Sequence, residues 1–394
     1  MRRVTIPIIY LTGLAQGFAL VVVPAASSLL TDPHGYGFSG AAYGALFIPM
    51  VAAAVAASAS GGVLALRWGL KRVLLAGLLL DVVAMGLVAS SAFFMGRPSP
   101  SYVILLAAML ALGGGFGSTL TAINRLAPAS FPDHAEPALT ALHALLGTGT
   151  ALAPVLVSAA AGAGWWWIPA LVAGVALALM LAAMTQPFTA PGPAPAAPRG
   201  GPRTLLREMS PTLWGFVAVV VLYGVCETLY GNWAIVYLHA DRGLSARTAG
   251  LALAVFWAMV TVGRVVIAVG SAWVPPRWIY RALPVVLIGS FLAVSRSGTA
   301  GAALVVFGAG GLACSAFLPL SVSFAETGFP ALAELMAGEL MAAYMIGYGI
   351  AAFAVGPLVD AGVASLGAIY LGASVVAAGM LALAYGLTRR ADAG

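Results

Sequence analysis

Long runs of apolar residues follow one another along this 394-residue chain. Each run reaches about 20 residues, the length that an α-helix needs to cross a bilayer. The runs are apolar on every side, whereas the strands of a membrane barrel alternate apolar and polar positions. The pattern therefore predicts membrane-spanning helices. Loop residues divide the chain into twelve of them, at residues 5–29, 41–66, 72–95, 101–127, 138–162, 165–187, 211–239, 246–272, 278–296, 300–325, 332–358 and 363–388.

The composition agrees with an all-α polytopic membrane protein. Hydrophobic residues make up 62% of the chain and charged residues 8%, with a mean hydropathy of +1.02, whereas soluble proteins carry about 25% charged residues. The first run is too long for a signal-peptide core and has no cleavage pattern, so we expect it to remain as the first helix. Cys226 and Cys314 both fall inside apolar runs, which favours neither disulfides nor a metal site. No cofactor is expected.

The distribution of basic residues predicts the topology. With the N-terminus in the cytoplasm, fourteen of the 18 Lys and Arg residues fall inside, as the positive-inside rule requires. The four outside are Arg97, Arg242, Arg247 and Arg296. We therefore expect a multi-pass protein of the cytoplasmic (inner) membrane with both termini in the cytoplasm. The net charge of +6 then anchors loops at the lipid bilayer and does not indicate nucleic-acid binding.

A stretch rich in Pro, Gly and Arg separates the sixth and seventh spans. It reads "TAPGPAPAAPRGGPRTLLRE" over residues 189–208, a composition typical of a linker. We predict an N-terminal half at residues 1–188, a cytoplasmic linker at 189–210 and a C-terminal half at 211–394. Two six-helix halves joined in this way are typical of the major facilitator fold, in which each half is built from inverted three-helix repeats.

The loop "GGVLALRWGLKRV", residues 61–73, resembles the signature that the major facilitator superfamily carries between its second and third helices. Leu66 stands where the superfamily has an acid. The resemblance implies a gating contact that is weakened by this loss, and basic anchoring of a short loop is the alternative. The predicted gating residues here are Gly62, Arg67, Gly69, Lys71 and Arg72.

The segments "YGVCETLYGNWAIVYL" and "GLSARTAGLALAVFWAMVTVGR" look like helices seven and eight of the fucose–galactose–glucose:proton symporter family. "GLAQGFALVVVP", "AINRLAP" and "FLPLS" resemble other helices of that family. The matching positions in helices seven and eight are Glu227, Trp233, Tyr237, Leu238, Phe256, Trp257, Gly263 and Arg264, of which Arg264 is also a predicted gating residue. The family's coupling acids in helices one and four correspond to Leu20 and Leu120, so the driving ion or the substrate is expected to differ.

Three acidic residues lie well inside predicted spans: Asp81, Glu227 and Glu339. A carboxylate inside a bilayer is costly and marks a candidate site, and desolvation favours the neutral form that suits a proton carrier. Glu227 and Glu339 are the predicted ion-coupling residues, with a structural hydrogen-bonding role as the alternative. Asp81 is expected to pair with an Arg on the cytoplasmic side or to mark a helix contact.

Polar and aromatic residues inside the spans could line a central cavity. Amides, carboxylates and aromatic rings suit a neutral, sugar-sized ligand, whereas polar contacts between membrane helices contribute about 1 kcal/mol and are the alternative. The predicted substrate-binding residues are Gln16, Asn124, His143, Glu227, Asn232, Trp233, Tyr237, Trp257, Phe317, Tyr344 and Tyr348.

These residues predict a monomeric secondary active transporter that moves a small polar organic solute by alternating access, coupled to a proton or sodium ion. A drug or metabolite exporter of the same fold and an uncoupled facilitator are the alternatives. A polytopic enzyme or sensor would need a catalytic motif, and neither a nucleotide-binding loop nor a hydrolase motif occurs in the sequence. We therefore expect no enzyme activity.

Overall fold

In a computed structural model of the protein, residues 2–160, 164–188 and 210–390 are described. These residues form helices and no strand. The first half holds α1 (Arg2–Ala25), α2 (Ser27–Thr31), α3 (Gly40–Ala45), α4 (Phe47–Trp68), α5 (Leu70–Ser91), α6 (Pro98–Ser130), α7 (Ala135–Ala160) and α8 (Trp167–Thr185). The second holds α10 (Pro211–Val236), α11 (Ala246–Gly270), α12 (Pro276–Ala293), α13 (Ala300–Cys314), α14 (Phe317–Gly328), α15 (Ala333–Asp360) and α16 (Leu366–Arg390).

Twelve segments of the described residues are long and apolar enough to cross a membrane. This confirms the all-α fold with twelve spans, and the bounds lie within a few residues of those predicted. Three spans are interrupted: α1 and α2 meet at Ala26, α3 and α4 at Leu46, and α13 and α14 at Ser315 and Ala316. The predicted linker, apart from residue 210, lies outside the described residues.

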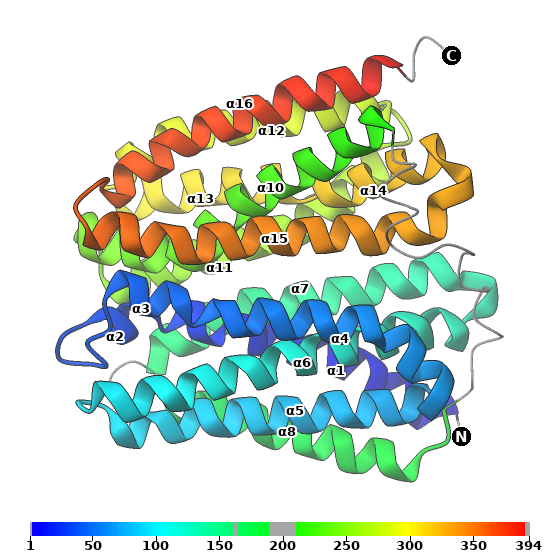
Figure 1. Cartoon of the computed structure of the whole chain (residues 1–394), viewed down its shortest axis with the longest axis horizontal. Helices are drawn as coiled ribbons and strands as arrows, with labels where there is room; N and C mark the ends of the chain where they lie inside the picture. The colour runs from blue at the N-terminus through cyan, green and yellow to red at the C-terminus, as the bar shows by residue number, and fades with distance from the viewer. Residues whose placement is uncertain (1, 161–163, 189–209, 391–394) are drawn as a thin grey trace.

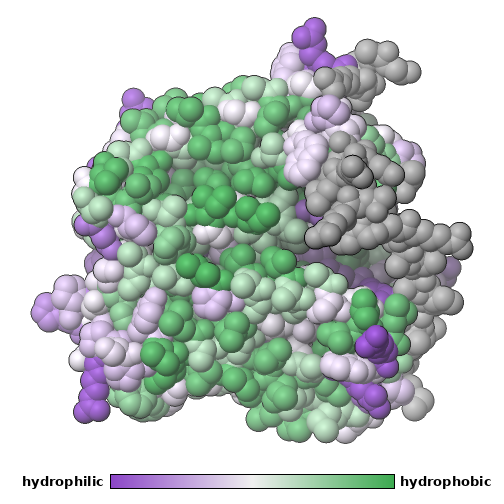
Figure 2. All heavy atoms as spheres, viewed as in Figure 1, coloured by the Kyte–Doolittle hydropathy of each residue, from purple (hydrophilic) through white to green (hydrophobic). Residues whose placement is uncertain are grey.

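The helices run roughly side by side in two stacked groups, α1–α8 below and α10–α16 above in Figure 1. Chain ends N and C lie on the same side of the molecule. Much of the outer surface is hydrophobic (Figure 2), and Val305 and Val375 are 72% and 73% exposed. Such side chains are stable on the outside of a protein when lipid tails surround them, so the surface agrees with a bilayer-embedded bundle.

The two groups of helices meet at the end of the molecule opposite the chain termini, which we call the closed end. Asp360, the last residue of α15, accepts hydrogen bonds from the backbone N–H groups of Gly40 (3.0 Å) and Ala41 (2.7 Å) at the start of α3. The hydroxyl of Tyr43 in α3 donates to the carbonyl oxygen of Asn232 in α10 over 2.8 Å. Polar contacts thus join the halves here.

The close approach at the closed end depends on glycine. A Cβ atom on Gly356 would overlap the backbone of Gly40, and one on Gly44 would meet the carbonyl oxygen of Ala352 at 2.5 Å. Only hydrogen atoms fit between these backbones, so α3 and α15 pack against each other without side chains between them. This packing places the carboxylate of Asp360 beside the free N–H groups of α3.

Candidate functional site

Glu227 lies in the middle of α10, on a stretch whose side chains are almost all buried. Its own side chain is 4% exposed. The hydroxyl of Tyr223, one turn earlier, donates to Glu227 Oε1 over 2.8 Å, and Tyr344 of α15 lies beside the same carboxyl group. Gly224 allows this arrangement, because a Cβ there would meet the carbonyl oxygen of Tyr344 at 2.5 Å. The sequence therefore brings α10 and α15 close around the acid.

The interruption between α13 and α14 exposes two backbone carbonyl groups beside Glu227. Pro319 has no N–H group, so it cannot donate the helical hydrogen bond to the carbonyl of Ser315. Arg264 of α11 donates to that oxygen instead, from Nε over 3.0 Å. The carbonyl oxygen of Cys314 lies 2.9 Å from the Tyr223 hydroxyl. Interrupted membrane helices are found where backbone carbonyls line a functional site.

Arg264 connects this site to the other half. It lies close enough for its charge to act on Glu227 and on His143 of α7. Helices α7 and α11 approach closely because Gly147 of α7 has no side chain. A Cβ atom there would overlap the hydroxyl of Thr261 on α11. Within the described part of the chain, the one ion pair closer than 4.0 Å is His34–Asp32, so Arg264 and Glu227 are not directly paired.

Two candidate residues, one in each half, carry buried polar atoms without a hydrogen-bond partner among the described residues. They are Oδ1 of Asn124 on α6 and Nε1 of Trp257 on α11. One is an acceptor from the first half and the other a donor from the second half. Both side chains are partly buried, as is His143. An unsatisfied buried polar atom is costly, so each one is a position that a bound solute or water can satisfy.

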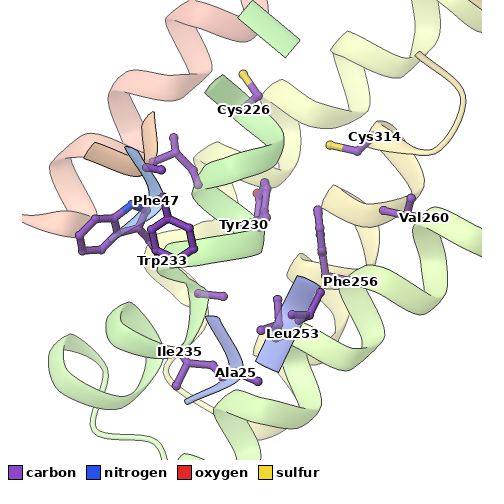
Figure 3. Close-up of a cluster of buried hydrophobic side chains, with 14 of the residues drawn as sticks. Ala25, Phe47, Cys226, Tyr230, Trp233, Ile235, Leu253, Phe256, Val260 and Cys314 are labelled. Atoms are coloured by element: carbon purple, nitrogen blue, oxygen red, sulfur yellow. The ribbon is translucent and has the colours of Figure 1, made fainter. Parts of the chain in front are cut away.

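Other predicted binding residues belong to the closed end. Asn232 and Tyr348 are hydrogen-bonded to each other over 3.0 Å through the amide nitrogen. Trp233 donates to the carbonyl of Ala351 over 3.2 Å, and its ring meets Tyr43 edge-on. Figure 3 shows Trp233 with Phe47 of the first half in one buried cluster. Both hydrogen bonds lie within the second half, and the ring of Trp233 makes the contact with the first half at the closed end.

Three more predicted residues lie within the packing of their own half. Tyr237 donates to the carbonyl of Val294 over 3.2 Å, and Phe317 is fully buried and stacked on Tyr280 at a ring distance of 4.5 Å. Gln16 is 2% exposed and accepts from the hydroxyl of Thr119 over 2.6 Å. Gln16 and Tyr237 therefore lie outside the group around Glu227, whereas the Phe317 ring also stacks on Tyr223, the hydrogen-bond partner of Glu227, at a ring distance of 5.7 Å. Glu339 is exposed near the start of α15.

The predicted gating loop, residues 61–73, is mostly helical: Gly62 and Arg67 lie in α4, Lys71 and Arg72 lie in α5, and Gly69 joins the two helices. Gly69 has a φ of +82°, a conformation that favours glycine, and it starts α5. Lys71 donates to the carbonyl oxygens of Met184 and Gln186, each over 2.8 Å, and so binds the end of α8 in its own half. A Cβ atom on Gly62 would meet nothing within 4 Å, and Arg67 and Arg72 are exposed. In this state the loop ties α5 to α8.

A twelve-span bundle in two groups, with a buried acid beside an interrupted helix and polar groups from both groups of helices, defines a membrane transporter. A family model of the Major Facilitator Superfamily matches residues 8–333. The chain belongs to this superfamily and is a transporter, not an enzyme.

Solved structures of similar fold are those of a variant of the nucleoside transporter NupG and of the fucose:proton symporter FucP. NupG is 16% identical, with a TM-score of 0.77 and 99% of each chain covered. A variant of E. coli FucP is 16% identical, with a TM-score of 0.62 and 98% of each chain covered. FucP in the outward conformation is 15% identical, with a TM-score of 0.62, covering 98% of this chain and 99% of that one. No curated protein sequence matches.

Proposed function

We propose that this transporter moves a small polar organic solute of the sugar or nucleoside class by alternating access, coupled to a proton at Glu227. The observation that carries the proposal is the buried Glu227 carboxyl group beside the interruption of α13 and α14, with Arg264 nearby. The structural neighbours are named for nucleoside transport and for fucose:proton symport, which supports a hydroxyl-rich solute. Functional sites of secondary transporters form at such interrupted helices near the middle of the bilayer.

The unpartnered polar atoms of Asn124 and Trp257 suit a neutral solute with several hydroxyl groups. Asn124 Oδ1 accepts a hydrogen bond and Trp257 Nε1 donates one, and neither has a partner among the described residues. A sugar or ribose hydroxyl both donates and accepts, so one solute can satisfy groups of either kind. Because Asn124 and Trp257 come from different halves, a solute between them would contact both halves at once, as a rocking mechanism requires.

The surroundings of Glu227 support proton coupling. The hydroxyl of Tyr223 lies within hydrogen-bond distance of both the Glu227 carboxyl and the carbonyl of Cys314. The Tyr223 hydroxyl has one proton, so it can donate fully to only one of these two oxygens. When the Glu227 carboxyl group is protonated, it donates to the Tyr223 oxygen, and the Tyr223 hydroxyl donates to the carbonyl of Cys314. A carboxyl group in such a position can bind and release a proton as the site opens to one side and then the other.

The direction in which the site opens follows from the predicted topology. If both termini lie in the cytoplasm, as the sequence predicts, the closed end would face the outside of the cell. The loop that holds Gly62, Arg67, Gly69, Lys71 and Arg72 then lies on the cytoplasmic side, where it would contact the second half when that side closes. Reporter fusions at each end of the chain test this topology.

A thermal-shift screen of the detergent-purified protein tests the solute class. Nucleosides, sugars, organic acids and lipophilic drugs are added separately, and we expect a nucleoside or sugar to raise the melting temperature because a ligand bound to the folded state stabilises it. Stabilisation by lipophilic drugs alone would contradict the proposal and favour an exporter.

Coupling is tested in liposomes with uridine and L-fucose as the first labelled probes. We expect Glu227→Gln to abolish uphill accumulation driven by a pH gradient and to spare exchange, because the amide cannot carry the proton. Glu136→Gln is the matched control, since Glu136 is exposed at the start of α7, and Glu339→Gln tests the other predicted coupling residue. Full uphill accumulation by Glu227→Gln would remove the coupling role.

A further inference from the structure

A second acid is buried in the first half, away from Glu227. Asp81 lies in the middle of α5 and its side chain is 4% exposed. Its Oδ1 atom packs against Gly115 of α6, where a Cβ would overlap it, and this oxygen has no hydrogen-bond partner among the described residues. The sequence left open an ion pair with Arg or a helix contact, and the structure places Asp81 in a contact between helices.

The polar group beside Asp81 is the amide of Gln16 on α1. The oxygen of this amide accepts from the hydroxyl of Thr119 over 2.6 Å, which directs its nitrogen away from Thr119. That nitrogen has no hydrogen-bond partner among the described residues. Two adjacent side chains, both more than nine-tenths buried, therefore place a donor and an acceptor close enough to interact, without a hydrogen bond of good geometry between Gln16 Nε2 and Asp81 Oδ1.

The elements around Asp81 supply no charge that would hold it ionised. α1 and α6 contribute the neutral groups of Gln16 and Thr119. Within the described residues, no Lys, Arg or His side chain forms an ion pair with the carboxyl group within 4.0 Å. A carboxyl group in an apolar interior without a nearby cation is more stable in its neutral, protonated form.

We propose that Asp81 binds and releases a proton during the transport cycle and that Gln16 responds to the change. An ionised Asp81 accepts a hydrogen bond from Gln16 Nε2 and draws α1 towards α5. A protonated Asp81 releases that nitrogen, as in the arrangement observed. The inference rests on the proposed transport function and does not depend on Glu227.

The position of α1 explains how this change would reach the interface between the halves. Gly13 and Gly17 of α1 lie against Leu142 and Leu146 of α7, so closely that a Cβ at Gly17 would overlap the Leu146 carbonyl. α1 also contacts α10, the helix that carries Glu227. A shift of α1 at Gln16 is therefore passed to α7, which carries His143, and to α10, which carries Glu227.

Infrared spectroscopy of the protein in liposomes tests the proposal without a solute. The wild-type protein is titrated from acidic to alkaline pH in H₂O and in D₂O, with Asp81→Asn as the comparison. We expect one protonated-carboxyl band that is absent from Asp81→Asn, weakens as the pH rises and shifts in D₂O because its proton exchanges with water. Glu227→Gln should leave this band unchanged, so a failure of coupling at Glu227 is distinguished from a failure here.

Labelling aspartate carboxyl groups with carbon-13 assigns the same band in the wild-type protein, even if Asp81→Asn does not fold. Asp81 is the one aspartate that is buried among the described residues, so the labelled buried band belongs to it. A band that neither titrates nor shifts in D₂O would identify a permanently protonated structural acid and overturn the proposal. The absence of the band, or a response to sodium at constant pH, would do the same.

Discussion

Replacing Asp360 with Ala should weaken the closed end while leaving each half intact. The carboxylate accepts hydrogen bonds from the backbone N–H groups of Gly40 and Ala41 across the interface. Its role is that of an N-cap supplied by the other half, because the first N–H groups of a helix have no partner within it. Ser39 caps α3 from within its own half by accepting from Ala42 over 3.1 Å, so α3 is expected to stay helical without Asp360.

The expected magnitude follows from this capping role. Loss of a capping side chain costs about 0.5–2 kcal/mol. The carboxylate is exposed, and water replaces part of the lost interaction, so we take about 1 kcal/mol. The contact exists only while this end is closed, so the whole loss falls on the closed state. A change of about 1 kcal/mol shifts the ratio of closed to open states by roughly fivefold.

Spin labels across the closed end measure this shift. Exposed positions on the two halves are available at His34 and Val363, and the native Cys226 and Cys314 are buried away from labelling reagents. We expect Asp360→Ala to move population from the short to the long label distance, and Asp360→Asn to have a smaller effect because its amide keeps one acceptor. Equal distance distributions for Asp360→Ala and the parent protein would refute the capping argument.

Two further substitutions test the geometry of the site and of the closed end. Pro319→Ala restores an N–H group that competes with Arg264 for the carbonyl of Ser315. We therefore expect slower solute exchange with an unchanged or raised melting temperature. Unchanged exchange with a lowered melting temperature would contradict this. Gly356→Ala places a methyl group against the backbone of Gly40 and should open the closed end in the spin-label assay. Gly372→Ala on α16 is the control, because a Cβ atom there would meet nothing within 4 Å. Equal behaviour of the two variants would rule out close backbone contact as the cause.

The sequence predicted the number of spans and their positions along the chain. A membrane helix must satisfy its own backbone hydrogen bonds, so the hydrophobicity of each segment is enough to identify it. The same reasoning singled out Glu227, because an acid inside such a run is rare. Tyr223 was also visible as its neighbour, since residues four apart share a helix face.

The other groups around Glu227 depend on contacts between distant segments. Tyr344 and Arg264 approach it from α15 and α11, and the carbonyl of Cys314 is free because α13 ends there. Pro319 is a local signal for a missing N–H group, but the sequence does not show which side chain satisfies the carbonyl of Ser315. The role of Asp360 could not be predicted from the sequence, because the N–H groups that donate to its carboxylate belong to residues more than 300 positions away.

Several predicted binding residues have other places in the structure. The Trp233 ring meets Tyr43 of the first half at the closed end, and the Asn232 side chain bonds Tyr348 within its own half. Phe317 and Tyr237 also pack within their half. Residue type and span position cannot separate these roles, since an aromatic ring suits a solute, a gate or a core equally well. Local hydrophobicity determined which segments cross the membrane, because each span meets the lipid on its own. The arrangement of the halves decided which polar groups face each other, because those contacts exist only between helices far apart in the chain.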